Sequence, residues 1–251
     1  MIEKENYMQF EVLNQHQGIV HLFTKKPFDF RTAKVGNQEI KKQYQKIEQL
    51  LNCSSKKILK PLQTHSAVVK KVERSNLDES FESVDGLLTN LKQVALVTSV
   101  ADCQSILLYD PVKQVIGNIH SGWRGTLNRI LTKAILLMEQ DYQCRAETIE
   151  VYFCPSILTC CFEVDLDVKE AFVIAFPDID LSSLITKKAK DKKYLIDLVG
   201  INLALLKALG ISESNIVTSN YCTKCHSDHL HSYRASKDAS GRNISFLMLT
   251  E

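Results

Sequence analysis

The stretch VALVTSVADCQSILLYDPVKQVIGNIHSGWRG, residues 94–125, decides the fold of this chain. Apolar runs rich in β-branched residues occupy 94–100, 105–109 and 115–120, and this composition is typical of buried strands. The Asp-Pro-Val-Lys segment 110–113 between the last two runs is typical of a tight turn. Strands joined by so short a connection pair antiparallel. The stretch therefore predicts an antiparallel hairpin.

The rest of the chain supplies further strands and four amphipathic helices. Apolar residues recur at helical spacing in residues 40–51, 127–138, 168–175 and 198–209. Asp165 is a candidate N-cap of the third helix, and Gly210 ends the fourth, where a left-handed cap is expected. Strand-like runs lie at 149–153, 216–219 and 244–249. Because strands and helices do not alternate regularly, the pattern predicts an α+β protein with mixed sheets.

Composition indicates one globular domain spanning residues 1–251. The chain has 45% hydrophobic and 24% charged residues, with only 9 Gly and 5 Pro and no linker-like segment. The formal net charge of +2 is too balanced to favour nucleic acid or an anionic membrane as the partner. No run approaches the ~20 apolar residues that span a bilayer, and the charged N-terminus does not resemble a secretory signal. We therefore expect a cytoplasmic protein, whose 8 cysteines are free thiols, metal ligands or a nucleophile.

Polar residues gather where the apolar runs end. Asp102 and Cys103 follow the first run, and His120 closes the third. The turn at 110–113 brings Cys103 and His120 close together, and His65 is a third candidate. Imidazole and thiolate are both good zinc ligands, and three protein ligands leave a fourth position for water. Two other interpretations stay open at this stage: a nucleophilic Cys–His pair without metal, and ordinary core residues.

Three arginines and a second group of cysteines complete the candidates. Arg124, Arg234 and Arg242 could each bind a phosphate bidentately or pair with a carboxylate. The segment Cys222-Thr223-Lys224-Cys225-His226 could form a second zinc site with a histidine, although we favour an ordered polar loop. The adjacent Cys160 and Cys161 are interpreted as small buried hydrophobic residues.

Read in order, the motifs resemble a known family. They are Gln63-Thr64-His65-Ser66, Val84-Asp85-Gly86-Leu87-Leu88-Thr89, Ala101-Asp102-Cys103, His120-Ser121-Gly122-Trp123-Arg124-Gly125 and Ser232-Tyr233-Arg234 with Gly241-Arg242. From about residue 60 to the C-terminus the chain is similar to the YfiH-type, laccase-domain family, also called multicopper polyphenol oxidase or purine nucleoside phosphorylase. Three positions depart from the family pattern: Cys154 stands where a glycine is usual, Ser156 where a cysteine is usual, and Gly86 where an alanine is usual.

The resemblance implies a fold, a metal and an activity. The implied fold is a sandwich of mixed sheets with flanking helices, related to cytotoxic-necrotizing-factor-type hydrolases. The implied zinc ligands are His65, Cys103 and His120. The implied reactions are phosphorolysis of adenosine, inosine, guanosine and methylthioadenosine, and deamination of adenosine, so the expected partners are a nucleoside and phosphate. Asp102 or Asp85 could transfer the proton, and an arginine could orient the phosphate.

Three rival functions remain. A copper oxidase of phenols is disfavoured because its copper centres need many more histidines than the three proposed, and the chain has only 7. A metal-free hydrolase would use Cys103 as nucleophile and His120 as base, editing peptidoglycan precursors as suggested for some bacterial relatives. A non-enzymatic binding module is the third.

Overall fold

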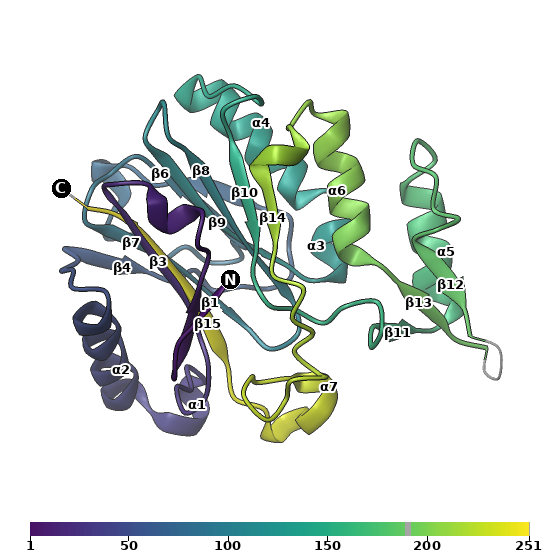
Figure 1. Cartoon of the computed structure of the whole chain (residues 1–251), viewed down its shortest axis with the longest axis horizontal. Helices are drawn as coiled ribbons and strands as arrows, with labels where there is room; N and C mark the ends of the chain where they lie inside the picture. The colour runs from purple at the N-terminus through teal and green to yellow at the C-terminus, as the bar shows by residue number, and fades with distance from the viewer. Residues whose placement is uncertain (189–191, 251) are drawn as a thin grey trace.

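In the computed structural model, which describes residues 1–188 and 192–250, two mixed six-stranded sheets pack face to face (Figure 1). The first sheet has the order β1 (Ile2–Glu3), β2 (Tyr7–Gln9), β3 (Ile19–Thr24), β15 (Asn243–Leu249), β7 (Val94–Val100) and β4 (Lys57–Leu59). The second has the order β14 (Ile216–Thr218), β10 (Glu150–Phe153), β8 (Gln104–Asp110), β9 (Val115–Ser121), β6 (Gly86–Thr89) and β5 (Val69–Lys71). A small third sheet has the order β11 (Glu163–Val164), β13 (Tyr194–Ile196) and β12 (Ile185–Lys187). The predicted α+β class with mixed sheets is confirmed.

The predicted hairpin is the β8–β9 pair at the centre of the second sheet. Asp110 pairs with Val115 at its closed end, and the Asp110 carboxylate accepts hydrogen bonds from the amides of Val112 and Lys113 at 2.8 and 2.9 Å. Gln114 has φ +52°, the left-handed conformation that reverses the chain. An aspartate that binds the two amides after it stabilises a turn, as the sequence predicts.

The space between the two large sheets contains apolar side chains around a small polar core. Phe23 and Leu247 of the first sheet are buried in one cluster with Leu107 of the second. At the middle, the hydroxyls of Thr98 and Ser105 lie 2.7 Å apart, and further hydrogen bonds connect them to Asn118 and Ser245, each at 0% or 1% exposure. Hydrogen-bonded polar groups at this depth fix the register between the sheets, because an unpaired one would cost about 1–3 kcal/mol.

Helices flank the sheets, and two of them cover the outer faces of the large sheets. The helices of the described residues are α1 (Thr32–Val35), α2 (Asn37–Leu50), α3 (Trp123–Leu127), α4 (Ile130–Tyr142), α5 (Leu166–Ala175), α6 (Leu198–Ala208) and α7 (Tyr233–Ser236). Ile47 of α2 packs on the first sheet, and α4 packs on the second through residues such as Ile135. Leu205 of α6 and Phe172 of α5 share a cluster beside the third sheet. Each fully buried Leu, Ile or Phe contributes roughly 1.5–3 kcal/mol of transfer free energy.

The four predicted helices and the predicted strands are confirmed, with differences at their ends. The second predicted helix is divided, because Arg129 adopts φ +56° between α3 and α4. Asp165 occupies the N-cap position of α5 but makes no capping hydrogen bond, since its carboxylate pairs with Lys193. The N-terminal strands and the third sheet were not predicted. Most of these strands have only two or three residues, too few to show an alternating pattern, whereas β3 has an apolar run, Ile19-Val20-His21-Leu22-Phe23, that could have been recognised. That residues 1–251 form one domain stays a prediction.

Among the residues described, none of the helices combines the length and apolar character that crossing a membrane requires.

Candidate metal centre and cavity

A cavity of about 620 Å³ opens where β7 and β8 meet the end of β9. Its wall includes His65, Asp102, Cys103, His120 and both Arg234 and Arg242. Ligand sites for small molecules typically have volumes of about 300–1,000 Å³, so the cavity is of the size that a nucleoside-sized ligand needs.

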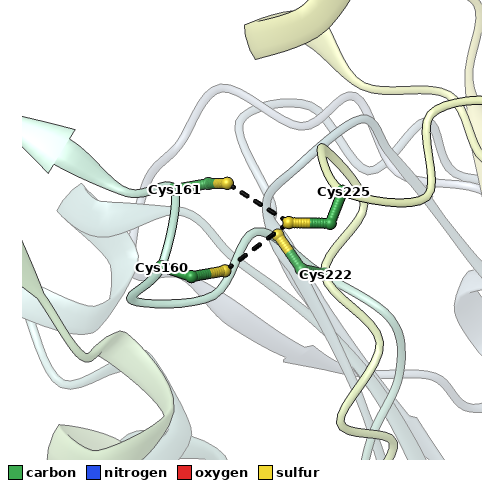
Figure 2. Close-up of side chains that lie close together, drawn as sticks. All are labelled: Cys160, Cys161, Cys222 and Cys225. Atoms are coloured by element: carbon green, nitrogen blue, oxygen red, sulfur yellow. Dashed lines mark hydrogen bonds between the residues drawn. The ribbon is translucent and has the colours of Figure 1, made fainter.

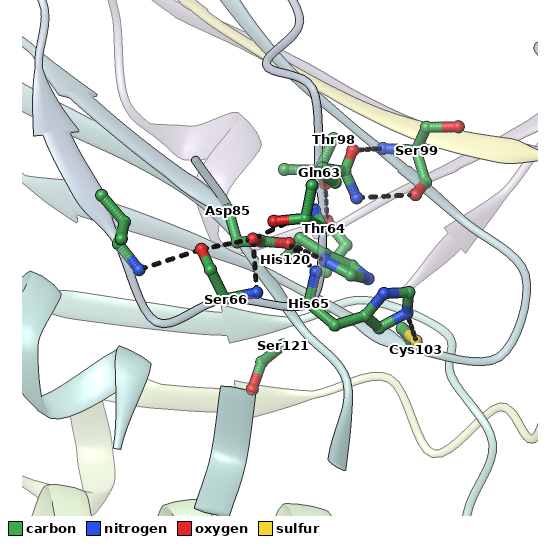
Figure 3. Close-up of polar contacts among 12 residues, drawn as sticks. Gln63, Thr64, His65, Ser66, Asp85, Thr98, Ser99, Cys103, His120 and Ser121 are labelled. Carbon is green, nitrogen blue, oxygen red and sulfur yellow. Dashed lines mark hydrogen bonds and ion pairs between the residues drawn. The ribbon is translucent and has the colours of Figure 1, made fainter. Parts of the chain in front are cut away.

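His120 is held rigidly at the end of β9. Its Nδ1 lies 2.7 Å from Oδ1 of Asp85, and its backbone amide donates to the carbonyl of Asp85 at 2.7 Å (Figure 3). Both side chains are buried, at 3% and 0% exposure. A carboxylate on Nδ1 fixes the ring orientation and leaves Nε2 free to act toward the cavity, which is a common arrangement behind metal-binding histidines.

The same carboxylate also shapes the loop that carries His65. Asp85 accepts hydrogen bonds from the amides of His65 and Ser66, at 3.1 and 2.7 Å, and from Oγ of Ser66 at 2.6 Å. His65 has φ +61°, a conformation that these bonds hold in place. Burial raises the pKa of Asp85, but the hydrogen bonds from His120 and Ser66 outweigh it and lower the pKa to about 2. Asp85 is therefore an anionic anchor for both histidines.

Cys103 completes the set from the other side of the hairpin. In the register, Ser105 faces His120, so Cys103 lies one pleat further along on the same face. Its Sγ lies 3.7 Å from Nε2 of His65, and the two imidazole rings are 5.0 Å apart between centroids. Burial raises the pKa of the Cys103 thiol, but His120 and His65 outweigh it and lower the pKa to about 6. The predicted proximity of the three side chains is confirmed.

The three side chains fit a metal ion. Their ligand atoms lie within 4.8 Å of one another. Zinc bonds of about 2.0 Å to nitrogen and 2.3 Å to sulfur in a tetrahedron separate N and S by about 3.5 Å, close to the 3.7 Å between Nε2 of His65 and Sγ of Cys103. Gly122 lies against this group: a Cβ there would be 2.9 Å from Cδ2 of His65 and 3.0 Å from Sγ of Cys103. A larger residue at Gly122 would therefore displace the donors.

Asp102, the second predicted acid, connects the cavity to two distant segments. It adopts φ +93°, and its carboxylate accepts hydrogen bonds from Oγ1 of Thr223 at 2.7 Å and from the amide of Arg234 at 2.6 Å. Asp102 lines the cavity, whereas Asp85 lies behind His120. Proton transfer by either residue stays a prediction.

The structure brings two of the three predicted arginines to the cavity. Nη1 of Arg234 donates to the carbonyls of Cys161 and Glu163, both at 3.1 Å, and Nη1 of Arg242 donates to the carbonyl of Gly241 at 2.9 Å. These bonds hold each guanidinium at the wall. Arg124 is exposed and lies over the ring of Trp123, at 4.2 Å from its centroid, outside the cavity lining.

Sequence reasoning missed part of the cavity wall. Lys60, Phe162 and Tyr233 line the cavity. Trp123 lines it too, and no role was predicted for this residue although it belongs to the motif that begins at His120. Gln63 also lines it, and its side-chain amide exchanges hydrogen bonds of 2.8 and 3.0 Å with the backbone of Ser99. The Gln-Thr-His-Ser motif was a usable signal for Gln63. Nothing local marked Lys60 or Phe162, because only the folded chain brings them to the cavity.

The interpretation of the adjacent cysteines is wrong for Cys160, which is exposed, and Cys161 is only half-buried. Cys154 and Ser156, two of the departures from the family pattern, are both buried. The possible second zinc site of Cys222, Cys225 and a histidine also differs from the structure. The side chains that lie close to Cys222 and Cys225 are those of Cys160 and Cys161.

Fold and donor set together define a class: an α+β sandwich with a His/Cys/His group at the wall of a cavity. Residues 31–250 match the family described as multi-copper polyphenol oxidoreductase laccase. A purine nucleoside phosphorylase of Borreliella burgdorferi is 31% identical over 239 residues, which is 95% of each chain. The adenosine deaminase RL5 of an unknown prokaryotic organism is 33% identical over 75% of this chain and 73% of that protein. The chain belongs to this laccase-domain family, as its motifs indicate.

A solved structure shares the fold. YlmD from Geobacillus stearothermophilus superimposes with a TM-score of 0.87 over 100% of this chain and 98% of that one, at 24% identity. The expected sandwich architecture is thereby confirmed.

Proposed function

We propose that this protein is a zinc-dependent purine nucleoside phosphorylase that also deaminates adenosine. The observation that carries the proposal is the convergence of His65, Cys103 and His120 on one cavity whose wall also holds two arginines. The names of the relatives, purine nucleoside phosphorylase and adenosine deaminase, support the substrate class. Adenosine, inosine, guanosine and methylthioadenosine are the proposed substrates.

Zinc is the metal that this donor set suits best. A thiolate and two imidazoles favour zinc, and copper oxidase centres need more histidines than the three here. When bound, zinc supplies a Lewis acid that makes water a better nucleophile near neutral pH. His65, Cys103 and His120 would hold the ion, and Asp85 would keep His120 in the tautomer that presents Nε2.

The residues that line the cavity could bind a purine base and act on its C6 position. Trp123, Phe162 and Tyr233 line the cavity, and aromatic side chains of this kind can stack on a purine. In deamination the oxygen of water bonds to C6 as ammonia leaves, and Asp102, at the cavity wall, is our candidate to transfer the proton. Asp85 is assigned a positioning role, because it lies behind His120, bonded to its Nδ1, and does not line the cavity.

Phosphorolysis needs a site for the phosphate dianion. An oxygen of phosphate bonds to C1′ of the ribose while the bond from C1′ to the purine breaks, and the leaving purine accepts a proton. Arg234 and Arg242 both line the cavity with one nitrogen held by backbone carbonyls. A guanidinium held in this way can bind phosphate without first being ordered.

The test is to follow products and metal together. Adenosine with phosphate should yield adenine and ribose 1-phosphate, and adenosine in water should yield inosine, both resolved by chromatography. Activity should follow zinc content after chelation and reloading. Oxidation of a phenol by copper-loaded protein, with neither nucleoside product at any phosphate concentration, would refute the proposal.

One alternative has a specific observation in its favour. Cys103, His120 and Asp85 form a nucleophile–base–carboxylate series, and the pKa of Cys103 is lowered to about 6 despite its burial. A metal-free hydrolase acting on peptidoglycan precursors would use this arrangement. This hydrolase would keep full activity after chelation, and a substrate-like electrophile would alkylate its Cys103. The zinc enzyme would instead lose activity on chelation.

A further inference from the structure

Two loops bring four cysteines together away from the cavity. Cys160 and Cys161 lie on the loop between β10 and β11, and Cys222 and Cys225 lie on the loop after β14 (Figure 2). Their sulfur atoms all lie within 4.8 Å of one another. Sγ of Cys225 is 3.8 Å from that of Cys160 and 3.5 Å from that of Cys161.

The proximity follows from the topology of the second sheet. β10 and β14 pair in parallel, so the loops that follow them leave the sheet at the same edge. The pairing continues past the strands: Ser156 and Cys222 form an isolated parallel bridge, and the amide of Thr223 donates to the carbonyl of Ser156 at 3.0 Å. The two loops are therefore held side by side by backbone contacts, independently of the sulfur atoms.

The separations suit a shared metal ion better than disulfides. A disulfide places its sulfurs about 2.05 Å apart. Four sulfurs bound at about 2.3 Å to one tetrahedral zinc ion lie about 3.8 Å apart. Cys222 and Cys225 also have the C-x-x-C spacing found in structural zinc sites. Among the described residues, the ligand atoms that meet here are the four cysteine sulfurs, without His226, whose Nδ1 lies 3.0 Å from the carbonyl oxygen of Cys222.

We propose that Cys160, Cys161, Cys222 and Cys225 bind one zinc ion as a tetrathiolate site, distinct from the group at the cavity. Binding converts four S–H groups to four Zn–S bonds and releases four protons to solvent, with no change in oxidation state. Four protein ligands leave no position for water, so the ion is structural and takes no part in turnover.

The site would join the loop that contributes Ile157 and Phe162 to the cavity wall to the loop that carries Cys222 and Cys225. The amide of Ile157 donates to the carbonyl of Asp102 at 2.8 Å, and Thr223 donates to its carboxylate. Nη1 of Arg234 donates to the carbonyl of Cys161 itself. An ion at the four sulfurs therefore fixes backbone that positions Asp102 and Arg234.

The experiment counts zinc ions per chain by native mass spectrometry on the full chain, produced with zinc and purified under reducing, anaerobic conditions. The Cys222→Ser/Cys225→Ser variant should hold one ion fewer than wild type, whereas the Cys53→Ser control, at a half-buried cysteine outside both groups, should hold as many as wild type. In Cys103→Ala, cobalt(II) replacing the remaining zinc should give the intense charge-transfer bands of a tetrahedral tetrathiolate. This spectrum decides the matter should the double-serine variant fail to fold.

The outcomes separate this site from the proposed active-site metal. Suppose that the cavity site alone lacks zinc. Wild type and Cys103→Ala then both hold one ion, and the Cys222→Ser/Cys225→Ser variant holds none. This outcome would support the tetrathiolate site and contradict the proposed metal at the cavity. Equal zinc content in the double-serine variant and the Cys53→Ser control would overturn it. Iron in place of zinc, or a mass four hydrogens lower through two disulfides among these cysteines, would also overturn it.

Discussion

The two groups of candidate ligands in this protein differ in donor type and in what holds them. The cavity group combines one thiol with two imidazoles, and the buried Asp85 braces both histidines through hydrogen bonds of 2.7–3.1 Å. The other group consists of four thiols on two loops, held by the backbone pairing beyond β10 and β14. Three donors beside a cavity leave room for a reacting molecule, whereas four donors complete a tetrahedron. The comparison supports both proposals, a metal that takes part in the reaction at the cavity and a structural metal at the four cysteines.

The largest expected effect comes from removing a ligand at the cavity. Replacing Cys103→Ala or His120→Ala should abolish tight binding of one zinc ion and lower both activities by about 10³-fold or more, because the metal contributes several kcal/mol to the transition state. Metal analysis and product assays measure this. Full zinc occupancy in both variants would show that the cavity group is not the ligand set.

The next largest effect should come from replacing the arginines at the cavity, and these variants should distinguish phosphorolysis from deamination. Arg234→Met or Arg242→Met should raise the phosphate requirement and weaken phosphorolysis by about 2–4 kcal/mol, because a partly buried charge contact is lost. Deamination, which uses water, should change little. Arg124→Met is the matched control, since Arg124 stacks on Trp123 outside the cavity. A proportional loss of both reactions in both cavity variants, with lower thermal stability, would assign the arginines to the fold alone.

The smallest effect should come from the anchor behind the ligands. Asp85→Asn removes the charge that orients His120 and the His65 loop, so zinc affinity or activity should fall about 10- to 100-fold. The tetrathiolate site should retain its ion. The control is Asp78→Asn, which changes an exposed carboxylate paired with Lys57. Zinc affinity and turnover equal to those of the control would contradict a positioning role for Asp85.

Local sequence was sufficient to predict the hairpin and the proximity of Cys103 to His120. The turn at Asp110 fixes the register of β8 against β9, and that register alone brings Cys103 onto the face of His120. Turn chemistry and strand alternation act over a few residues, so they can be read directly. No spacing rule connects His65 to the hairpin, so its place beside Cys103 and His120 was expected only from the family motifs.

Only the tertiary structure decided which distant residues meet. Cys160 and Cys225 are 65 positions apart, and they approach because β10 and β14 are parallel neighbours in the sheet. The same holds for the arginines: all three belong to recognised motifs, yet Arg234 and Arg242 reach the cavity and Arg124 does not. Sheet order depends on how whole faces bury apolar area against one another, and this free energy is spread over both large sheets. No short segment contains this free energy. Local sequence therefore identified the candidate ligand residues, and the tertiary structure decided which of them lie together.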